Sequence, residues 1–494
     1  MEELSRLVKL INRHGQKGSV LLNLQDEHTL EARLFRLLEE SKVRTDQDAT
    51  FALYGSETLT SNYRMLKSRF RKKLNNHLHL VKLTDKYFDQ HIIATQECLS
   101  LLHNGFTLMQ LSEQRMADRK FDQVWELAKE NELTDLGIKA LEYKQTLCAN
   151  SGNLKEYMRL DSLLHQERPL RAAEQEALKI YHLCMVQQKT NVKARAALLS
   201  QYPDTLAHMR SIWQSTGSSV VYSYYHILRI NYLEFSGNYE GVVEAVIEAN
   251  KLHTKGLINK AWYNHRFNLH IQIYALLRSK RYEEGLTLAA EAVNHFDQFS
   301  SNWYAVMENY ILLALHARQY GLAVSLLEGA LTEGHHAKIS DIILERFELI
   351  RLHALLLEKV SWIDKVELKE SFKGQLAFLP KDKTGFNLAL LQLDILEVLA
   401  KPKNDLEQQA ERVRKYTSKY LKGEKAERPR LFMRMLQLAL QEHSLAVVQE
   451  RGEKLLNKLK VTPLPGDAFA EVEVVPYEHL WALVLELLEL RQKH

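Results

Sequence analysis

Six basic side chains crowd into one short segment near the N-terminus: Arg64, Lys67, Arg69, Arg71, Lys72 and Lys73. No acidic residue interrupts the stretch from Arg64 to Lys73. Guanidinium and ammonium groups at this density can neutralise backbone phosphates, and arginine can also bond base edges in the major groove. The segment is therefore a candidate basic contact surface for nucleic acid.

The same segment also predicts an ordinary amphipathic helix that begins at Thr60 or Ser61 and ends at Lys82. Its apolar residues follow helical spacing: Tyr63, Leu66, Phe70, Leu74, Leu78 and Val81. The cations occupy the rest of the circumference, which is typical of a solvated helix. The helix superficially resembles the recognition helix of winged-helix regulators, but the stretch 75–81 lacks the turn signal that would open a wing. Nucleic-acid binding is therefore the less favoured interpretation.

A second basic stretch runs from Arg412 to Arg434, with Glu424 and Glu427 as its only acidic residues. Tyr416 and Tyr420 lie among its cations, an arrangement that suits single-stranded nucleic acid or an acidic partner. A charge run of this kind more often forms a solvated helical face. We therefore assign it no site.

Patterns of catalysis and metal binding do not occur in the sequence. His265 and His270 are five residues apart, off the i,i+4 spacing that aligns two ligands on one helical face. No His-Glu-x-x-His, Gly-x-Ser-x-Gly or Cys-x-x-Cys motif is found. The cysteines are widely spaced and predict reduced, buried thiols: Cys98, Cys148 and Cys184. We expect a non-enzymatic protein with no catalytic residue, no cofactor and no metal site.

The composition predicts an all-α chain. Only 8 of the 494 residues are proline and 19 are glycine, and the formal net charge is +4. The one convincing strand pattern is the alternation from Phe469 to Val475. No apolar run is long enough to cross a membrane, and charged residues follow Met1 closely, so we expect a soluble cytoplasmic protein with no membrane contact.

Three segments are expected along the chain. Residues 1–84 predict a helical N-terminal module that contains the basic helix, and residues 85–460 predict successive helical hairpins. Residues 461–494 predict a proline-containing linker and a C-terminal helix. That helix, from Tyr477 to Arg491, is apolar over most of its surface and should be buried as a terminal cap, with docking of a partner as the alternative.

One short sequence motif, called here the repeated phrase, occurs three times within residues 202–335. Its copies are Ser236–Gly241, Ser279–Gly285 and Ala317–Ala323. Each copy follows one apolar helical stretch and precedes another, which predicts the turn of a helical hairpin. Weaker copies are expected at Lys120–Trp125, Gly152–Tyr157 and Gln441–Val448. Hairpins of this size bury their apolar faces only by stacking on one another, so the repetition predicts a solenoid.

The repeat resembles the tetratricopeptide family, in which a turn with Gly or Asn and Tyr precedes a helix carrying small residues. The small residues here are Ala245, Ala249, Ala289, Ala292, Ala323 and Ala330. The resemblance covers 202–335 well and the rest of 85–460 weakly, and it implies a divergent α-solenoid of stacked hairpins. The chain departs from the family at Ile230, Ile273 and Ile311, where the first helix of each hairpin usually has a small residue.

In such solenoids the first helix of each hairpin lines the concave face. Counting from the turn tyrosines, the resemblance places these residues there: Tyr224, Asn231, Glu234, His270, Tyr274 and Glu308. Polar and aromatic groups on such a wall can hold an extended peptide, although Tyr224 and Tyr274 could simply pack between repeats. We expect a scaffold that binds a protein or peptide partner of unknown identity. A repeat-containing transcriptional regulator is the alternative.

Overall fold

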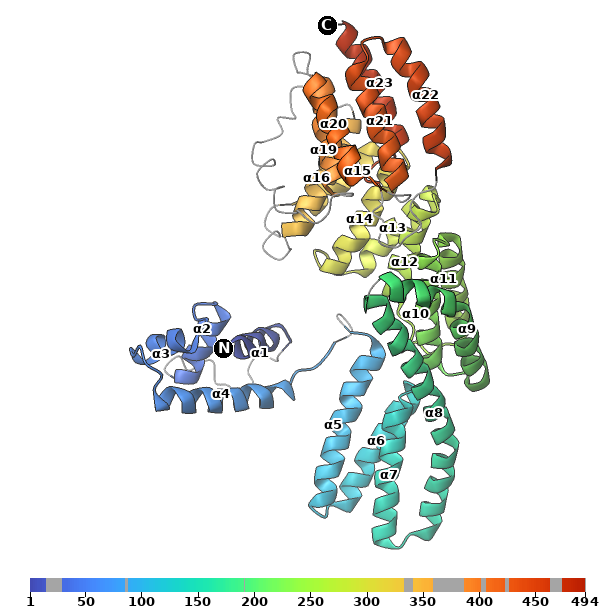
Figure 1. The fold of residues 1–494 in the computed structure, drawn as a ribbon. Coiled ribbons are helices and arrows are strands. Elements are labelled where there is room, and N and C mark those ends of the chain that lie inside the picture. Colours follow the sequence, from blue (N-terminus) through green and yellow to red (C-terminus); the bar gives the residue numbers. More distant parts are fainter. Residues whose placement is uncertain are drawn as a thin grey trace. The chain divides into compact units, whose positions relative to one another are not determined.

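The computed structural model describes residues 1–14, 29–84, 88–190, 192–332, 341–358, 386–400, 406–422, 426–462 and 473–493. These residues form 21 α-helices and one short 3₁₀ helix, η1 (Val293–His295), and no strand (Figure 1). The prediction of an all-α chain is confirmed. Of the expected strand, residues 473–475 are not extended into a sheet, and residues 469–472 lie outside the described part of the chain.

The chain divides into two compact units. The first contains Met1–Glu176, Trp213–Val221 and Ile258–Tyr263, and the second contains Ala177–Ile212, Tyr222–Leu257 and Asn264–His494. This division crosses the segment 85–460 that the sequence predicts as one solenoid. The expected boundaries after residues 84 and 460 remain predictions, and each unit is described by itself.

Four helices open the first unit. They are α1 (Glu2–His14), α2 (Leu30–Glu39), α3 (Asp46–Tyr54) and α4 (Ser61–Leu78). Thr29, Thr45 and Thr60 cap the last three, because each hydroxyl accepts a hydrogen bond from the backbone amide three residues later. Thr45 also forms a capping box, since the Asp48 carboxylate accepts from the Thr45 amide in return.

The apolar stripe of α4 packs against α1 and α2 in a core of its own. That core includes Leu4, Val8, Leu34, Phe35, Leu38, Tyr63, Leu66, Phe70 and Leu74. The helix ends at Leu78, earlier than predicted, and the chain continues through i→i+3 hydrogen bonds at residues 79–81. His77 is buried while Leu78 is 36 % exposed, because His77 continues the stripe one turn after Leu74 and Leu78 falls on its flank.

Helices joined by short turns follow in the first unit. They are α5 (Gln90–Gln110), α6 (Gln114–Glu130), α7 (Thr134–Ser151) and the start of α8 (Leu154–Thr190). The weak repeat copy at Gly152 does form a turn, with Gly152 in the left-handed region at φ 70°. The copy at Lys120–Trp125 does not, so that prediction is wrong. It lies in the middle of α6, where Phe121 and Val124 are buried among α5 and α7.

The helices from residue 192 to residue 357 carry the clear repeats. They are α9 (Val192–Thr216), α10 (Ser219–Phe235), α11 (Tyr239–Thr254), α12 (His265–Arg278), α13 (Tyr282–Ala292), α14 (Ser301–His316), α15 (Tyr320–Ala330) and α16 (Asp341–Leu357). All three copies of the repeated phrase lie in turns between helices, as predicted. The residue before the last of each turn has positive φ: Gly237 at 70°, Lys280 at 62° and Arg318 at 62°.

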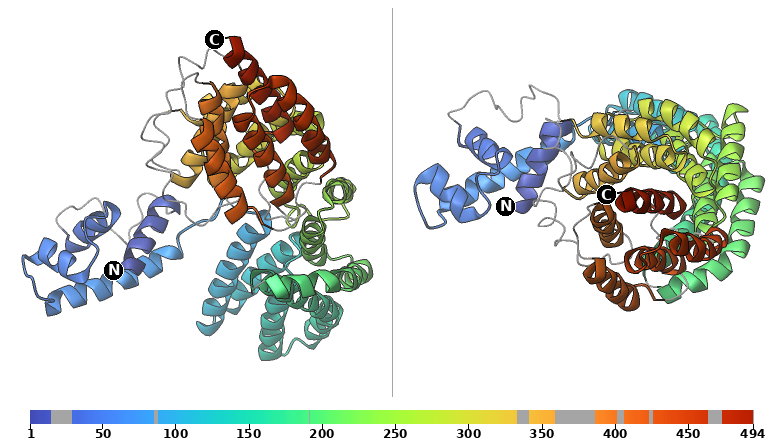
Figure 2. Two further views of the ribbon diagram at one scale, coloured as in Figure 1. Left: turned by 45° about the horizontal axis from the view of Figure 1, so that its top comes forward. Right: turned by 90° about the horizontal axis from the view of Figure 1, so that it is seen from above.

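Within the second unit, hairpins pack on their neighbours through both kinds of helix. The first helices α12 and α14 contact each other as well as their own second helices, and α14 also contacts α16 (Figure 2). The small residues expected at the helix contacts are all buried, and so are Ile230, Ile273 and Ile311. The Gly285 side of α13 approaches α14 so closely that an added Cβ would lie 2.6 Å from Leu313 Cδ2.

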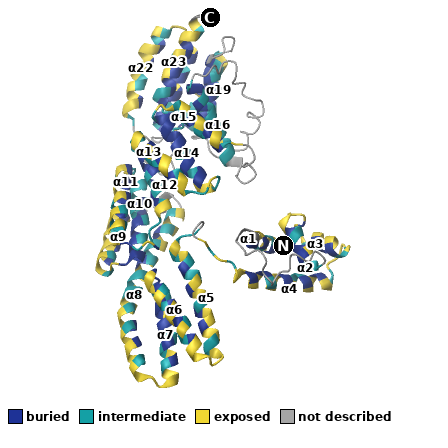
Figure 3. Ribbon diagram, turned by 180° about the vertical axis from the view of Figure 1, so that it is seen from behind, coloured by how far each residue is buried: buried dark blue, intermediate teal, exposed yellow. Residues whose placement is uncertain are grey.

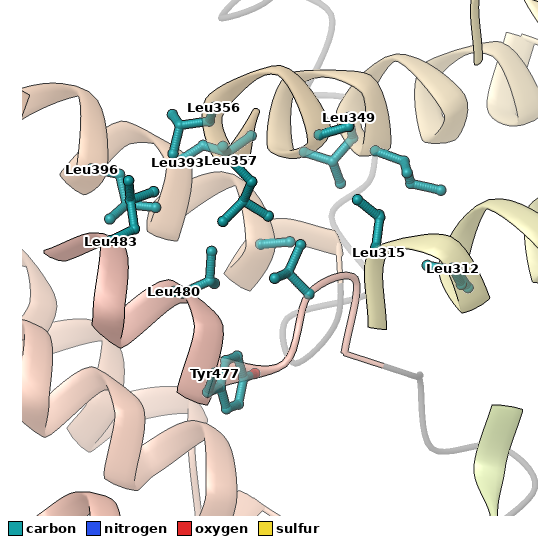
Figure 4. Packing of buried hydrophobic residues seen from close by; sticks show 14 of the residues in the cluster. Leu312, Leu315, Leu349, Leu356, Leu357, Leu393, Leu396, Tyr477, Leu480 and Leu483 are labelled. Atoms are coloured by element: carbon teal, nitrogen blue, oxygen red, sulfur yellow. The ribbon is translucent and has the colours of Figure 1, made fainter. Parts of the chain in front are cut away.

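The remaining helices end the second unit. They are α19 (Phe386–Ala400), α20 (Leu406–Tyr420), α21 (Glu427–Gln441), α22 (Leu445–Val461) and α23 (Tyr477–Lys493). The repeat copy at Gln441–Val448 spans the turn between α21 and α22. Burial of the last helix is confirmed: Leu480 and Leu483 belong to one apolar cluster with Leu315, Leu357 and Leu396 of earlier helices (Figure 4). The prolines of the expected linker at 463 and 465 lie outside the described residues.

A buried arginine ties the start of α23 to the end of α22. Arg428 Nε donates to Glu473 Oε1 at 2.7 Å, and Nη2 donates to Glu478 Oε1 at 3.1 Å. Arg428 Nη1 donates to the carbonyl oxygens of Leu459 at 2.7 Å and Thr462 at 3.1 Å. The Arg428 side chain is only 4 % exposed, so this guanidinium is neutralised inside the protein.

Candidate functional site

The six residues expected on the concave face lie on the first helices of three hairpins. Tyr224, Asn231 and Glu234 lie on α10, His270 and Tyr274 on α12, and Glu308 on α14, and all six are half-buried. These side chains therefore combine partial exposure with contact to the core. We call this set the inner wall.

Glu234 lies near enough to Tyr274, at the turn end of the inner wall, for its charge to add to the rise that burial causes in the pKa of the Tyr274 phenol. Arg278 lies beside them in the last turn of α12, and its guanidinium carbon is 4.9 Å from the centre of the Tyr239 ring. Arg278 Nη2 also donates to Tyr239 Oη at 3.1 Å. The Tyr274 ring meets the same Tyr239 edge-on, with ring centres 5.9 Å apart. Two aromatic rings, a carboxylate and a guanidinium thus meet where two hairpins join.

Burial dominates the electrostatics of Glu234. It raises the pKa of this carboxyl group to about 7, although the charge of Arg278 opposes the rise. Burial likewise raises the pKa of the Tyr274 phenol. Glu234 therefore changes its charge close to neutral pH, unlike an ordinary surface glutamate.

Two residues of the inner wall have hydrogen-bonding capacity that the described residues do not use. The Glu234 carboxylate makes no hydrogen bond or ion pair with any described residue. His270 Nδ1 is buried and has no hydrogen-bond partner there, and burial lowers the pKa of this imidazole. Buried polar atoms are nearly always satisfied in folded proteins, so such atoms mark places where a ligand could add a bond.

Other members of the inner wall are already engaged within the fold. The Tyr224 ring stacks on Tyr181 of α8 with ring centres 5.0 Å apart. Glu308 Oε1 accepts from Arg346 Nη2 of α16 at 2.7 Å. Burial raises the pKa of Glu308, and the Arg346 charge opposes that rise. Tyr224 therefore fits the plainer packing role, while Glu308 joins two first helices.

One buried polar contact behind the inner wall is not evident in the sequence. His226 Nε2 lies 2.7 Å from Asn268 Oδ1, which joins α10 to α12. Burial lowers the pKa of His226 to about 4, so the imidazole is neutral at physiological pH. In the sequence, this histidine and this asparagine stand at helix positions where the apolar periodicity predicts core residues. The periodicity alone does not indicate that the two polar side chains bond each other.

The basic residues of α4 fall into two groups. Lys67 Nζ lies 2.7 Å from Asp46 Oδ1, Arg71 Nη2 lies 3.1 Å from Glu3 Oε2, and Lys73 pairs with Glu31. The other group, Arg64, Arg69 and Lys72, is exposed and has no acidic partner among the described residues. The first group stabilises the module, and only the second remains as a contact surface.

The second basic stretch is neutralised in part by the fold. Arg412 Nη2 lies 2.9 Å from Asp394 Oδ2, and Arg414 Nε lies 2.8 Å from Glu411 Oε2. A depression of about 700 Å³ along α20 is lined in part by these same paired side chains. Arg428 belongs to the buried network at α23. These contacts support the interpretation of this stretch as a solvated and structural surface.

No group of three potential metal-ligating side chains assembles among the described residues. Burial raises the pKa of Cys98 to about 11 and also raises that of Cys184, so neither thiol is activated as a nucleophile. A helix with the length and apolar character needed to span a bilayer is not found in the described part of the chain.

Comparison of the chain with known protein families, curated protein sequences and solved structures gives no match.

Proposed function

We propose that this protein is a non-enzymatic scaffold that binds a protein or peptide partner along the inner wall. The observation that carries the proposal is the unused hydrogen-bonding capacity of Glu234 and His270 on neighbouring first helices. A carboxylate and an imidazole that are half-buried without partners lose the hydration of the unfolded chain and gain little in return. A ligand that bonds to them recovers that free energy.

The packing of the second unit supports a tetratricopeptide-like solenoid as the architecture of this scaffold. Successive first helices contact one another from α12 to α16, so their side chains form one continuous surface. Each hairpin also contacts the next through its second helix. A stack of this kind presents many weak contacts in register, so binding should be distributed over several residues.

The chemistry of the inner wall favours an extended segment with a basic side chain. Glu234 offers a carboxylate beside the Tyr274 ring, and both can contact an ammonium or guanidinium group. Asn231 lies one turn before Glu234 on α10 and can bond the backbone of a peptide through its amide. A cationic ligand would also lower the pKa of Glu234, so its affinity should increase from pH 6 to pH 8.

The proposal is tested with the double variant Asn231→Ala/Tyr274→Ala. Tagged wild-type and variant proteins are used to capture partners from native lysate, and captured proteins are quantified by mass spectrometry. A partner of the inner wall should be retained by the wild type and depleted several-fold with the variant. Circular dichroism should show unchanged helicity.

A matched control is Glu244→Ala/Glu291→Ala, which changes exposed residues of the second helices α11 and α13. This control should retain the same partner as the wild type. The conservative variant Tyr274→Phe keeps the ring and its packing, and it separates loss of the hydroxyl from loss of stability. Equal retention of every partner by the double variant and the control would contradict the inner wall as the binding surface.

A further inference from the structure

The cations of α4 differ in their angular position around the helix and in whether they pair with an acidic residue. An α-helix turns about 100° per residue, so position along α4 gives the angular place of each side chain. The buried stripe contains Tyr63, Leu66, Phe70, Leu74 and His77. Lys67 and Lys73 flank this stripe, Arg71 lies farther round the helix near Arg64, and all three pair with acids of α1, α2 and α3. Arg64, Arg69 and Lys72 fall on the opposite side.

The side of α4 opposite the buried stripe is basic and polar, apart from one methionine. Between its three cations lie hydroxyl and amide side chains and one exposed methionine, and α4 contains no acidic residue at all. Leaving aside Leu78 and Arg71, which is exposed but paired with Glu3, the exposed residues are Ser61, Asn62, Arg64, Met65, Ser68, Arg69, Lys72, Asn75 and Asn76. We call this set the outer face of α4. All its polar groups can bond to phosphate oxygens or to base edges.

The described helices of the module leave the outer face open. Helices α1, α2 and α3 lie on the other side of α4, and the exposed residues follow its length (Figure 3). With 18 residues, α4 is about 27 Å long. A helix of this length fits the major groove of B-form DNA, which is about 12 Å wide, whereas the major groove of duplex RNA is too narrow.

We propose that the N-terminal module binds double-stranded DNA through the outer face of α4. Arg64, Arg69 and Lys72 neutralise backbone phosphates, and the serine and asparagine side chains between them add hydrogen bonds. This site is separate from the inner wall, so it neither requires nor excludes the scaffold function. The paired cations Lys67, Arg71 and Lys73 hold the module together and do not contact the DNA.

The test uses the full-length protein and a fluorescein-labelled 24-base-pair DNA duplex of mixed sequence. Fluorescence anisotropy gives the affinity between 50 and 200 mM KCl for the wild type and for R64Q/R69Q/K72Q. Each phosphate contact contributes about 0.9 to the slope of log affinity against log salt, so three contacts contribute about 2.7. Over this salt range the wild-type affinity should fall about 40-fold more than that of the variant.

The matched control is R414Q/K415Q/K454Q, which removes the same net charge from side chains that are 64 %, 75 % and 75 % exposed. Its affinity and salt slope should equal those of the wild type. Thermal melting checks that both triple variants fold. If the α4 variant does not, the single variants R64Q, R69Q and K72Q should each reduce the slope by about 0.9.

Three outcomes would overturn the proposal. The first is no binding of the wild type to DNA at 50 mM KCl. The second is an equal loss of affinity in the α4 variant and in the control, which would mean that only net charge matters. The third is tighter binding to a duplex RNA of the same sequence, or to vesicles containing phosphatidylserine, than to the DNA.

Discussion

The guanidinium of Arg278 lies over the ring of Tyr239 at 4.9 Å and donates to its hydroxyl at 3.1 Å. Tyr239 is the turn residue of one hairpin, and Arg278 ends the first helix of the next. The same relationship returns farther along the chain. The turn residue Tyr282 meets the His316 ring edge-on with ring centres 5.5 Å apart, and Tyr320 Oη lies 3.3 Å from His479 Nδ1. The repeated tyrosine therefore joins its hairpin to another element, which is the next first helix for Tyr239 and Tyr282 and the last helix α23 for Tyr320.

Loss of the Tyr239–Arg278 contact should destabilise the second unit. We expect Tyr239→Phe to lower the free energy of unfolding by about 1 kcal/mol, because one buried hydrogen bond is lost. Arg278→Met also removes the cation–ring contact, and the two changes should couple by about 1 kcal/mol in a double-mutant cycle. Urea denaturation followed by circular dichroism measures each term. Strictly additive effects would contradict a direct contact.

The charge of Glu234 should make stability depend on pH in a defined window. Its pKa is raised from 4.5 in the unfolded chain to about 7, so its stabilising contribution is complete below pH 4.5 and decreases as pH rises to 7. Glu234→Gln should therefore be more stable than the wild type by about 2 kcal/mol at pH 8, with the difference vanishing near pH 4.5. Urea midpoints at the two pH values measure this. Glu244→Gln, at an exposed position of α11, should show no such trend.

The turn residue Lys280 is in the left-handed region at φ 62°, where the equivalent residue of the preceding hairpin is Gly237. A side chain at this φ costs about 1 kcal/mol. We expect Lys280→Gly to raise the free energy of unfolding by about 0.5 kcal/mol after the greater freedom of glycine in the unfolded chain is included. The control is Lys255→Gly, because Lys255 is the residue directly after α11 and has φ −78°, where glycine brings no relief and should destabilise. Chemical denaturation of both variants decides the sign.

Arg428 should be the most sensitive residue of the α23 region. Arg428→Met leaves the Glu473 carboxyl group buried without its cation, and breaking such a pair from one side costs about 3–5 kcal/mol. The control Lys458→Gln breaks the more exposed pair with Glu427 and should cost less than about 1 kcal/mol. Thermal melting compares the two. Similar melting temperatures would mean that packing alone holds α23 in place.

The turns between helices were predictable from the sequence only where a short stretch of residues distinguishes a turn from the middle of a helix. The turns before Tyr239, Tyr282 and Tyr320 were predicted because polar and glycine residues interrupt two apolar helices there. The phrase at Lys120 has a similar composition, yet Phe121 and Val124 are buried in the middle of α6. An aromatic residue flanked by charges serves a helix core and a turn equally well, so composition alone could not separate the two cases.

The candidate sites were predictable only in part, because their character depends on contacts between distant residues. Arg278 and Tyr239 are 39 positions apart, and no periodicity links them. The cations of α4 were found as a group, but their division required knowing that Asp46, Glu3 and Glu31 pack beside the helix. Burial of Glu234 and His270 likewise follows from the stacking of hairpins and not from their own sequence neighbours.

The Arg428 side chain also holds together two segments that are separated along the chain. It bonds the carbonyl oxygens of Leu459 and Thr462 on one side and the carboxylates of Glu473 and Glu478 on the other. Thr462 and Glu473, which flank the interval 463–472, therefore bond the same guanidinium, which acts as a noncovalent crosslink between them. The entropy of closing a loop by such a crosslink grows only with the logarithm of the loop's length, and a doubling costs about 0.6 kcal/mol. This interval should therefore accept an inserted tag or fluorescent reporter with little effect on folding.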